Sequence, residues 1–83
     1  MAKDAEDLND SYIDNHYIKI GQNVARIRNL NKLSQLALSQ KMGFKSTSLI
    51  AGAETYYKKQ HFNIEHLIKL SYILDCDIKE FFN

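Results

Sequence analysis

Residues 34–54 read SQLALSQKMGFKSTSLIAGAE, and this stretch decides the fold. Ser34 is a residue type that caps helix N-termini by accepting a free backbone N–H. Leu33 before it and Leu38 after it have the spacing of a hydrophobic staple, which fixes how the chain enters a helix. Gly43 then supplies the left-handed conformation that ends many helices. The pattern predicts a short helix that closes in a glycine turn.

A second short helix follows the turn. We expect Ser46 to cap it and Glu54 to end it, with Leu49 or Ile50 together with Ala53 facing the interior. Two short helices joined by such a turn form a helix-turn-helix, whose second helix lies in the major groove of DNA in proteins that use the motif for recognition.

A longer helix precedes this pair. It runs from about residue 11 to 30, with Ser11 and Asp14 as a weak capping box and a possible kink at Gly21. Residues 1–10 are polar and acidic, and we expect them to be a flexible tail. The apolar stripe of this helix recurs every three or four positions, at Ile13, Tyr17, Ile20, Val24 and Ile27.

Two more helical segments are expected toward the C-terminus. Asn63 caps the first of them, with Phe62 and Leu67 as its staple. Asp77 and Glu80 form the next capping box and open a last short turn. No stretch alternates apolar and polar residues as a strand does. The sequence therefore predicts an all-α bundle of five short helices.

The bulk composition fits one small globular domain. The chain has 83 residues, of which 45 % are apolar and 25 % are charged, and it contains no proline. The apolar runs are too short to cross a membrane, and no leader sequence opens the chain, so we expect a cytoplasmic protein. The single cysteine, Cys76, excludes an internal disulfide and fits a reducing compartment.

The net charge of +1 conceals a strong segregation of charge along the chain. Residues 1–16 carry a net charge of −4, whereas residues 61–83 carry −2. Residues 17–60 contain eight lysines and arginines against the single acidic residue Glu54, a net charge of +7. A basic central segment of this kind indicates a partner that is a polyanion.

The sequence resembles the Cro/lambda-repressor-type (XRE) helix-turn-helix domain over about residues 18–82. The resemblance is carried by three runs in order: IGQNVARIRNLNKLSQLALSQKMG, STSLIAGAE and FNIEHLIKLSYILDCDIKEFF. Its most specific positions are Arg28, Ser34, Gln35, Gly43, Glu54, Leu67, Leu74 and Phe82. The resemblance implies a five-helix lambda-repressor-like DNA-binding domain over residues 11–83, with an N-terminal extension.

The resemblance also implies roles for particular residues. Gln35 matches the glutamine that contacts the DNA backbone and braces the recognition helix. Arg28 and Glu54 match a shielded salt bridge between the first and third helices. The recognition positions become Ser46, Thr47, Ser48, Ala51 and Gly52, with Thr55 at the edge.

Two departures from the family pattern stand out. The spacing from Gly43 to Glu54 is one residue longer than usual, with the extra residue around Phe44-Lys45. The proline that precedes the fourth helix in the family is replaced by His61-Phe62-Asn63, and Asn63 can supply the cap.

The expected recognition helix has few residues that read bases strongly. Discrimination usually uses Arg against guanine, or Asn and Gln against adenine, and residues 46–54 contain none of these. Thr47 and Ser48 offer hydroxyls, and the methyl groups of threonine and alanine can touch a thymine methyl. Gly52 either permits close approach to DNA or makes room for packing; the sequence leaves both interpretations open.

Cationic side chains flank this helix and predict phosphate contacts. Lys45 is expected at its start, where free amides already favour an anion. Residues 55–62 break the helical periodicity and form a loop that contains Lys58, Lys59 and Gln60. Lysine supplies charge without directional readout, so these contacts would add affinity rather than sequence preference.

We therefore expect a sequence-specific DNA-binding transcriptional regulator, in particular a repressor, that binds double-stranded operator DNA as a homodimer. The expected dimer surface is Tyr72, Ile73, Phe81 and Phe82, although these residues could instead complete the core. The rival surface is the N-terminal segment with Tyr12, Ile13 and His16.

The alternative function is an antitoxin-like or protein-interaction module that keeps the fold but binds DNA weakly. His61, His66 and Cys76 do not have the spacing of a zinc module, so we expect no metal and no cofactor. No catalytic arrangement is present in the sequence, so we do not expect an enzyme.

Overall fold

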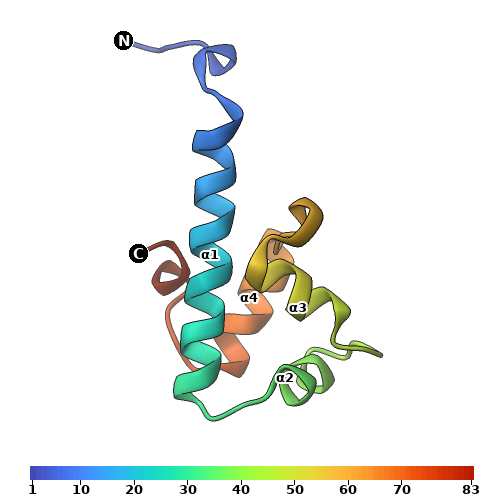
Figure 1. The fold of residues 1–83 in the computed structure, drawn as a ribbon. Coiled ribbons are helices and arrows are strands. Elements are labelled where there is room, and N and C mark those ends of the chain that lie inside the picture. The colour runs from blue at the N-terminus through green and yellow to red at the C-terminus, as the bar shows by residue number, and fades with distance from the viewer.

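A computed structural model describes residues 1–83, and it is all-helical, without strands (Figure 1). Its α-helices are α1 (Asp10–Leu30), α2 (Gln35–Lys41), α3 (Ser48–Thr55) and α4 (Ile64–Ile73). Three short 3-10 helices complete the chain: η1 (Ala5–Asp7), η2 (Tyr57–Lys59) and η3 (Ile78–Phe82). The fold therefore has four α-helices rather than the expected five, because the last segment is the 3-10 helix η3.

The long helix α1 begins earlier than the expected capping box would place it. Asn9 is the N-cap, and its side-chain oxygen accepts the N–H of Tyr12 at 2.8 Å. The predicted cap at Ser11 is wrong, because the helix has already begun at Asp10. The tail before it contains the single turn η1. In Figure 1 the N-terminal half of α1 extends beyond the other α-helices, whereas its C-terminal half lies among them.

The α2 helix and its glycine turn form as predicted. The Ser34 hydroxyl accepts the N–H of Ala37 at 3.0 Å and caps α2. After α2, Gly43 adopts a left-handed conformation with φ of +81°. The N–H of Gly43 donates to the Gln40 carbonyl at 3.0 Å, and the N–H of Phe44 donates to the Ser39 carbonyl at 2.9 Å. This pair of bonds is a Schellman motif, which satisfies carbonyls that the helix end would otherwise leave free.

The start of α3 differs from the prediction. Ser46 is not its cap; Thr47 occupies the N-cap position and makes no side-chain cap bond. Thr47 makes no cap bond because its backbone is helical (φ −82°, ψ −5°) rather than extended, the conformation in which a cap side chain reaches the first amides. The Ser46 hydroxyl accepts the N–H of Ser48 at 3.3 Å. Helix α3 therefore begins later than the predicted cap implies.

The α4 helix has the predicted cap and a second bond in addition. Asn63 accepts the N–H of His66 at 2.8 Å, while His66 Nδ1 accepts the N–H of Asn63 at 3.1 Å, which completes a capping box. The predicted staple residues Phe62 and Leu67 are both buried. Partial burial lowers the pKa of His66, which favours the neutral ring that this acceptor role requires.

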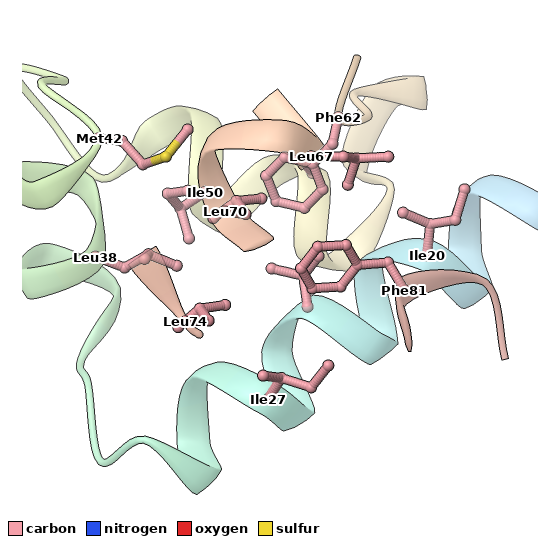
Figure 2. Packing of buried hydrophobic residues seen from close by; sticks show 12 residues of the cluster. Ile20, Ile27, Leu38, Met42, Ile50, Phe62, Leu67, Leu70, Leu74 and Phe81 are labelled. Atoms are coloured by element: carbon pink, nitrogen blue, oxygen red, sulfur yellow. The ribbon is translucent and has the colours of Figure 1, made fainter. Parts of the chain in front are cut away.

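Twelve buried apolar residues from all four α-helices and the segments after them form one core (Figure 2). Ile50 is fully buried and Leu49 only partly, so Ile50 and Ala53 are the inward residues of α3. The complete set is Ile20, Val24, Ile27, Leu38, Met42, Ile50, Ala53, Phe62, Leu67, Leu70, Leu74 and Phe81.

The C-terminal segment η3 is held against α1. The Asn23 side-chain amide donates to the backbone carbonyls of Phe81 at 3.0 Å and Asn83 at 2.9 Å. The Asp77 carboxylate accepts the N–H of Lys79 at 3.0 Å and opens the segment. Phe81 is fully buried beside α1, so η3 closes the core.

Gly21 allows α3 to lie close to α1. A Cβ atom at this position would collide with the backbone carbonyl oxygen of Ala53 and lie 2.8 Å from that of Glu54. Backbone atoms inside a packed helix cannot move aside as a flexible side chain can. The glycine that suggested a kink is therefore explained by this contact within a continuous α1.

We predict that Gly21→Ala lowers the free energy of unfolding by about 1–3 kcal/mol, because the added methyl group must push α3 away from α1. Urea unfolding of the two proteins measures the difference. Gln22→Ala, at the exposed neighbouring position, is the control and should leave the urea midpoint unchanged. An unaltered midpoint in Gly21→Ala would show that α3 does not need this close contact.

Candidate nucleic-acid interface

A buried salt bridge orients α3. Arg28 Nε donates to Glu54 Oε2 at 2.7 Å, and Arg28 Nη2 donates to Glu54 Oε1 at 3.0 Å. The exposed fractions of the two side chains are 11 % and 3 %, so the pair is shielded from water. Two parallel bonds of this kind fix both the distance and the angle between guanidinium and carboxylate. The pairing expected from the resemblance is present.

Neighbouring polar groups complete this bridge. Arg28 Nη1 donates to the Leu33 carbonyl at 2.8 Å, between α1 and α2. The Gln35 amide, at the start of α2, donates to Glu54 Oε1 at 3.0 Å. No buried side-chain nitrogen or oxygen in the chain lacks a hydrogen-bond partner. Three helices therefore share one polar network, in which Gln35 braces α3 as the resemblance implies.

We predict that Glu54→Gln lowers the free energy of unfolding by about 3–5 kcal/mol, because Arg28 keeps its charge in a shielded position without a carboxylate. Thermal or urea unfolding measures this loss. Glu65→Gln is the matched control: Glu65 pairs with Lys69 at 2.8 Å on an exposed face of α4, and its loss should hardly change stability. Equal effects of the two substitutions would contradict a special role for the buried bridge.

The outer face of α3 and the loop that follows it form a shallow depression. Five predicted DNA-binding residues line it, and Tyr57 is a sixth residue that the sequence did not single out. The six lining residues are Ser48, Ala51, Gly52, Thr55, Tyr57 and Gln60. The structure therefore brings together recognition positions from the helix and a residue from the loop.

Most side chains of this face are short or already engaged. The Ser48 hydroxyl lies 3.2 Å from that of Ser46, and the Thr55 hydroxyl donates to the Ala51 carbonyl at 3.0 Å. The methyl groups of Ala51 and Thr55 remain for apolar contact. Thr47 is half-buried at the start of the helix.

Gly52 lies beneath the side chain of Gln60. A Cβ atom at Gly52 would collide with Gln60 Oε1 and come within 2.7 Å of Gln60 Cδ. Gly52 is accordingly buried although it lies on the outer face of α3. In this structure the protein's own Gln60 side chain fills the space at Gly52, an arrangement that corresponds to the packing interpretation.

The loop after α3 is held in an uncommon backbone conformation. Tyr56, Lys58 and Lys59 all have positive φ values, of 56°, 50° and 63°. Non-glycine residues persist in this region only when surrounding contacts hold them there, and such residues cluster at functional sites.

The contacts that hold this loop come from the projecting half of α1. The Tyr56 hydroxyl donates to Asp14 Oδ1 at 2.7 Å, and this bond, with a smaller contribution from burial, raises the pKa of Tyr56 to about 12. The Tyr17 ring stacks on His61, with centroids 4.1 Å apart, and on Tyr56 at 5.8 Å. The loop is therefore anchored at both ends against α1.

The cationic side chains of this surface differ in whether an acidic side chain lies near them. Lys59 Nζ lies 3.6 Å from Asp14 Oδ1; the lysine side chain is 69 % exposed and the aspartate side chain 28 % exposed. Lys58 has no acidic partner within 4.0 Å, and its ammonium lies 5.3 Å from the centroid of the Tyr57 ring. Lys45 is exposed, but it lies in the bend before Ser48 and not at the start of α3, where it was predicted.

The residues expected at a dimer surface do not share one environment. Tyr72 is 86 % exposed and Phe82 is 50 % exposed, whereas Ile73 packs partly against the core. Phe81 is fully buried, so its assignment to the dimer surface is wrong; it completes the core instead. Phe81 and Phe82 are adjacent in η3, and the packing of this segment on α1 turns Phe81 inward.

Sequence reasoning missed Asp14 and Tyr17 as supports of the loop. Their spacing marks both as part of α1 alone, and nothing in it indicates that Asp14 has a partner 42 residues away in Tyr56. No group of three or more potential metal-ligating side chains is present, and no helix is long and apolar enough to span a membrane.

No family model, curated protein or solved structure matches this chain. Its function is therefore inferred from its own residues and their geometry.

Proposed function

We propose that this protein is a lambda-repressor-like helix-turn-helix protein of the XRE type that binds operator DNA as a homodimeric transcriptional repressor. The observation that carries the proposal is the braced pair of α2 and α3, whose outer face joins recognition positions to a basic loop. Recognition by α3 requires a helix held rigidly at a fixed angle, and the Arg28–Glu54 bridge supplies that restraint.

The shape of this face suits a helix that enters the major groove. The side chains that α3 contributes to the depression are those of serine, alanine and threonine, which are short enough for its backbone to approach base edges closely. The helix-turn-helix reads DNA with the N-terminal part of its second helix, where Thr47 and Ser48 lie. Specificity at the helix itself would then come from hydroxyl and methyl contacts and from DNA shape.

The charge distribution supports phosphate binding on either side of this helix. The segment from residue 17 to residue 60 carries a net charge of +7, and Lys45, Lys58 and Lys59 lie before and after α3. We expect affinity to fall steeply with salt, as counterions released from about six to eight phosphates per dimer return to the DNA.

We predict that replacing both Lys58 and Lys59 by alanine weakens binding to every duplex alike. The slope of log Kd against log salt should fall by about one for each phosphate that the variant no longer neutralises. Fluorescence anisotropy with random-sequence duplex at several salt concentrations measures both quantities.

The matched control replaces Lys69 and Lys79 by alanine, which changes the net charge equally but outside the surface of α3 and its loop. That variant should keep the salt slope of the parent. A Lys58/Lys59 variant that binds as tightly as the parent would contradict the phosphate role. Absence of binding by the parent at low salt would contradict DNA binding itself.

A stripe of exposed apolar side chains on α4 supports the homodimer. Ile64, Ile68 and Tyr72 recur every four residues and are 63 %, 55 % and 86 % exposed. Residues four apart lie on one face of a helix, so the three form one apolar strip. A symmetric pair of subunits could bury two such strips against each other. We propose this strip as the dimer surface; of the residues predicted from the sequence it contains only Tyr72.

We predict that a double variant with Ile68→Glu and Tyr72→Glu is monomeric, because dimer formation would bury its added carboxylates in an apolar contact. Light scattering coupled to size exclusion measures the mass, and circular dichroism checks that the fold persists. Tyr12→Glu with Ile13→Glu is the matched control on the rival N-terminal surface and should remain dimeric. A dimeric α4 variant beside a monomeric N-terminal variant would move the interface to α1.

One observation favours the second candidate, a protein-interaction module. The projecting half of α1 exposes Tyr12 and Ile13, and it is preceded by the exposed Leu8 in an acidic segment. An antitoxin-like protein could hold a partner with this segment. Titration against random duplex at low salt separates the candidates, since the module would bind DNA weakly or not at all.

A further inference from the structure

The Gln60 amide occupies a place that its position in the sequence does not suggest. It lies on the outer face of α3, directly over Gly52, and lines the depression with Ser48, Ala51 and Thr55. The residue itself belongs to the loop and comes directly after η2. A side chain from outside the helix therefore occupies the surface from which a side chain at position 52 would otherwise project.

The amide is free to bind a ligand. Gln60 is exposed, and its side-chain amide makes no hydrogen bond within the protein. Two donors and one acceptor therefore remain available on the face of α3. No other amide or guanidinium group lines this depression, whose remaining polar groups are hydroxyls.

The backbone beside Gln60 is fixed, which limits where the amide can go. The Gln60 N–H donates to the Tyr57 carbonyl at 3.0 Å, and the next residue, His61, is bonded through Nδ1 to the Lys59 carbonyl at 2.9 Å. His61 also stacks on Tyr17 of α1. Because the backbone of Gln60 is already fixed, binding costs less conformational entropy than it would in a mobile loop. The amide is therefore partly preorganised.

We propose that Gln60 reads an adenine in the major groove, and that Gly52 is the positioning residue that lets it reach the base. The proposal rests on the proposed function. A glutamine amide can donate to N7 and accept from the N6 amino group of adenine at the same time, a bidentate pair that the hydroxyls of α3 cannot make. Recognition would then use one helix and one loop residue together.

Gly52 leaves free the space that the Gln60 amide occupies, and a larger residue there would displace the end of this exposed side chain. In the middle of a helix glycine is less favourable than alanine by about 1 kcal/mol, so local stability favours alanine at this position. The overlying Gln60 side chain is the contact that a methyl group at this position would disturb. Glycine in α3 and glutamine in the loop thus form one structural unit.

The test is a selection of bound duplexes from a random library, carried out with the parent and with Gln60→Ala. The parent should select a site with an adenine that Gln60→Ala no longer prefers, and the preference at that position should fall by about 5- to 150-fold, the range of one bidentate base contact. Preferences at the other positions should persist. Ser48→Ala is the matched control and should alter a different position.

Gly52→Ala tests whether the position of the Gln60 amide matters, because this variant keeps the amide but changes the space beneath it. It should lower the same adenine preference although Gln60 is still there, because the added methyl group displaces the amide, and it should have no further effect in the Gln60→Ala background. Circular dichroism and urea unfolding establish that each variant folds. A parent that selects a defined site, with Gln60→Ala selecting the same site, overturns this inference and leaves DNA binding intact. A parent that binds no DNA overturns both.

Discussion

The buried pair of Arg28 and Glu54 is the constraint on which the rest of the structure depends. Moving two charges out of water is costly, so such a pair persists only when its geometry is good and its remaining hydrogen bonds are satisfied. Here two direct bonds join the charges, and Leu33 and Gln35 satisfy further groups. The network ties α1 to the beginning of α2 and to the end of α3. It therefore determines the angle at which α3 is presented.

The parts of the fold that the sequence predicts well are those decided by local interactions. Ser34 and Asn63 each cap a helix by contacting an amide three residues away, and Gly43 closes α2 through its own left-handed conformation. Ser46 and Phe82 show the limit of this reasoning. Ser46 is a good cap by type and its hydroxyl accepts the N–H of Ser48, but α3 begins later than this cap implies, with Thr47 at the N-cap position. The choice of Phe81 over Phe82 for the core depends on how η3 packs on α1, which no local pattern encodes.

The residues of the candidate site could be predicted from the sequence, but the residues that hold its loop in place could not. Most of the recognition positions line one depression, because helical spacing alone places them on one face. The loop conformation depends instead on Asp14 and Tyr17, which lie far away in the sequence. One consequence is an opposition of charges: Asp14 of the acidic N-terminal segment lies beside Lys59, a predicted phosphate ligand. The same carboxylate that accepts the Tyr56 hydroxyl would therefore compete for Lys59 with the phosphates of the proposed DNA partner.

Two restraints hold the last turn of α3 in place. Gly21 brings α1 against the carbonyl groups of Ala53 and Glu54, and the salt bridge holds the Glu54 side chain. Both restraints act directly after Gly52, so the rotation of the helix at that residue is fixed. The loop begins directly after α3 ends, and it folds back so that Gln60 covers Gly52. The outer face of α3 has no long polar side chain of its own, and the loop supplies one, Gln60, over the turn that these restraints hold.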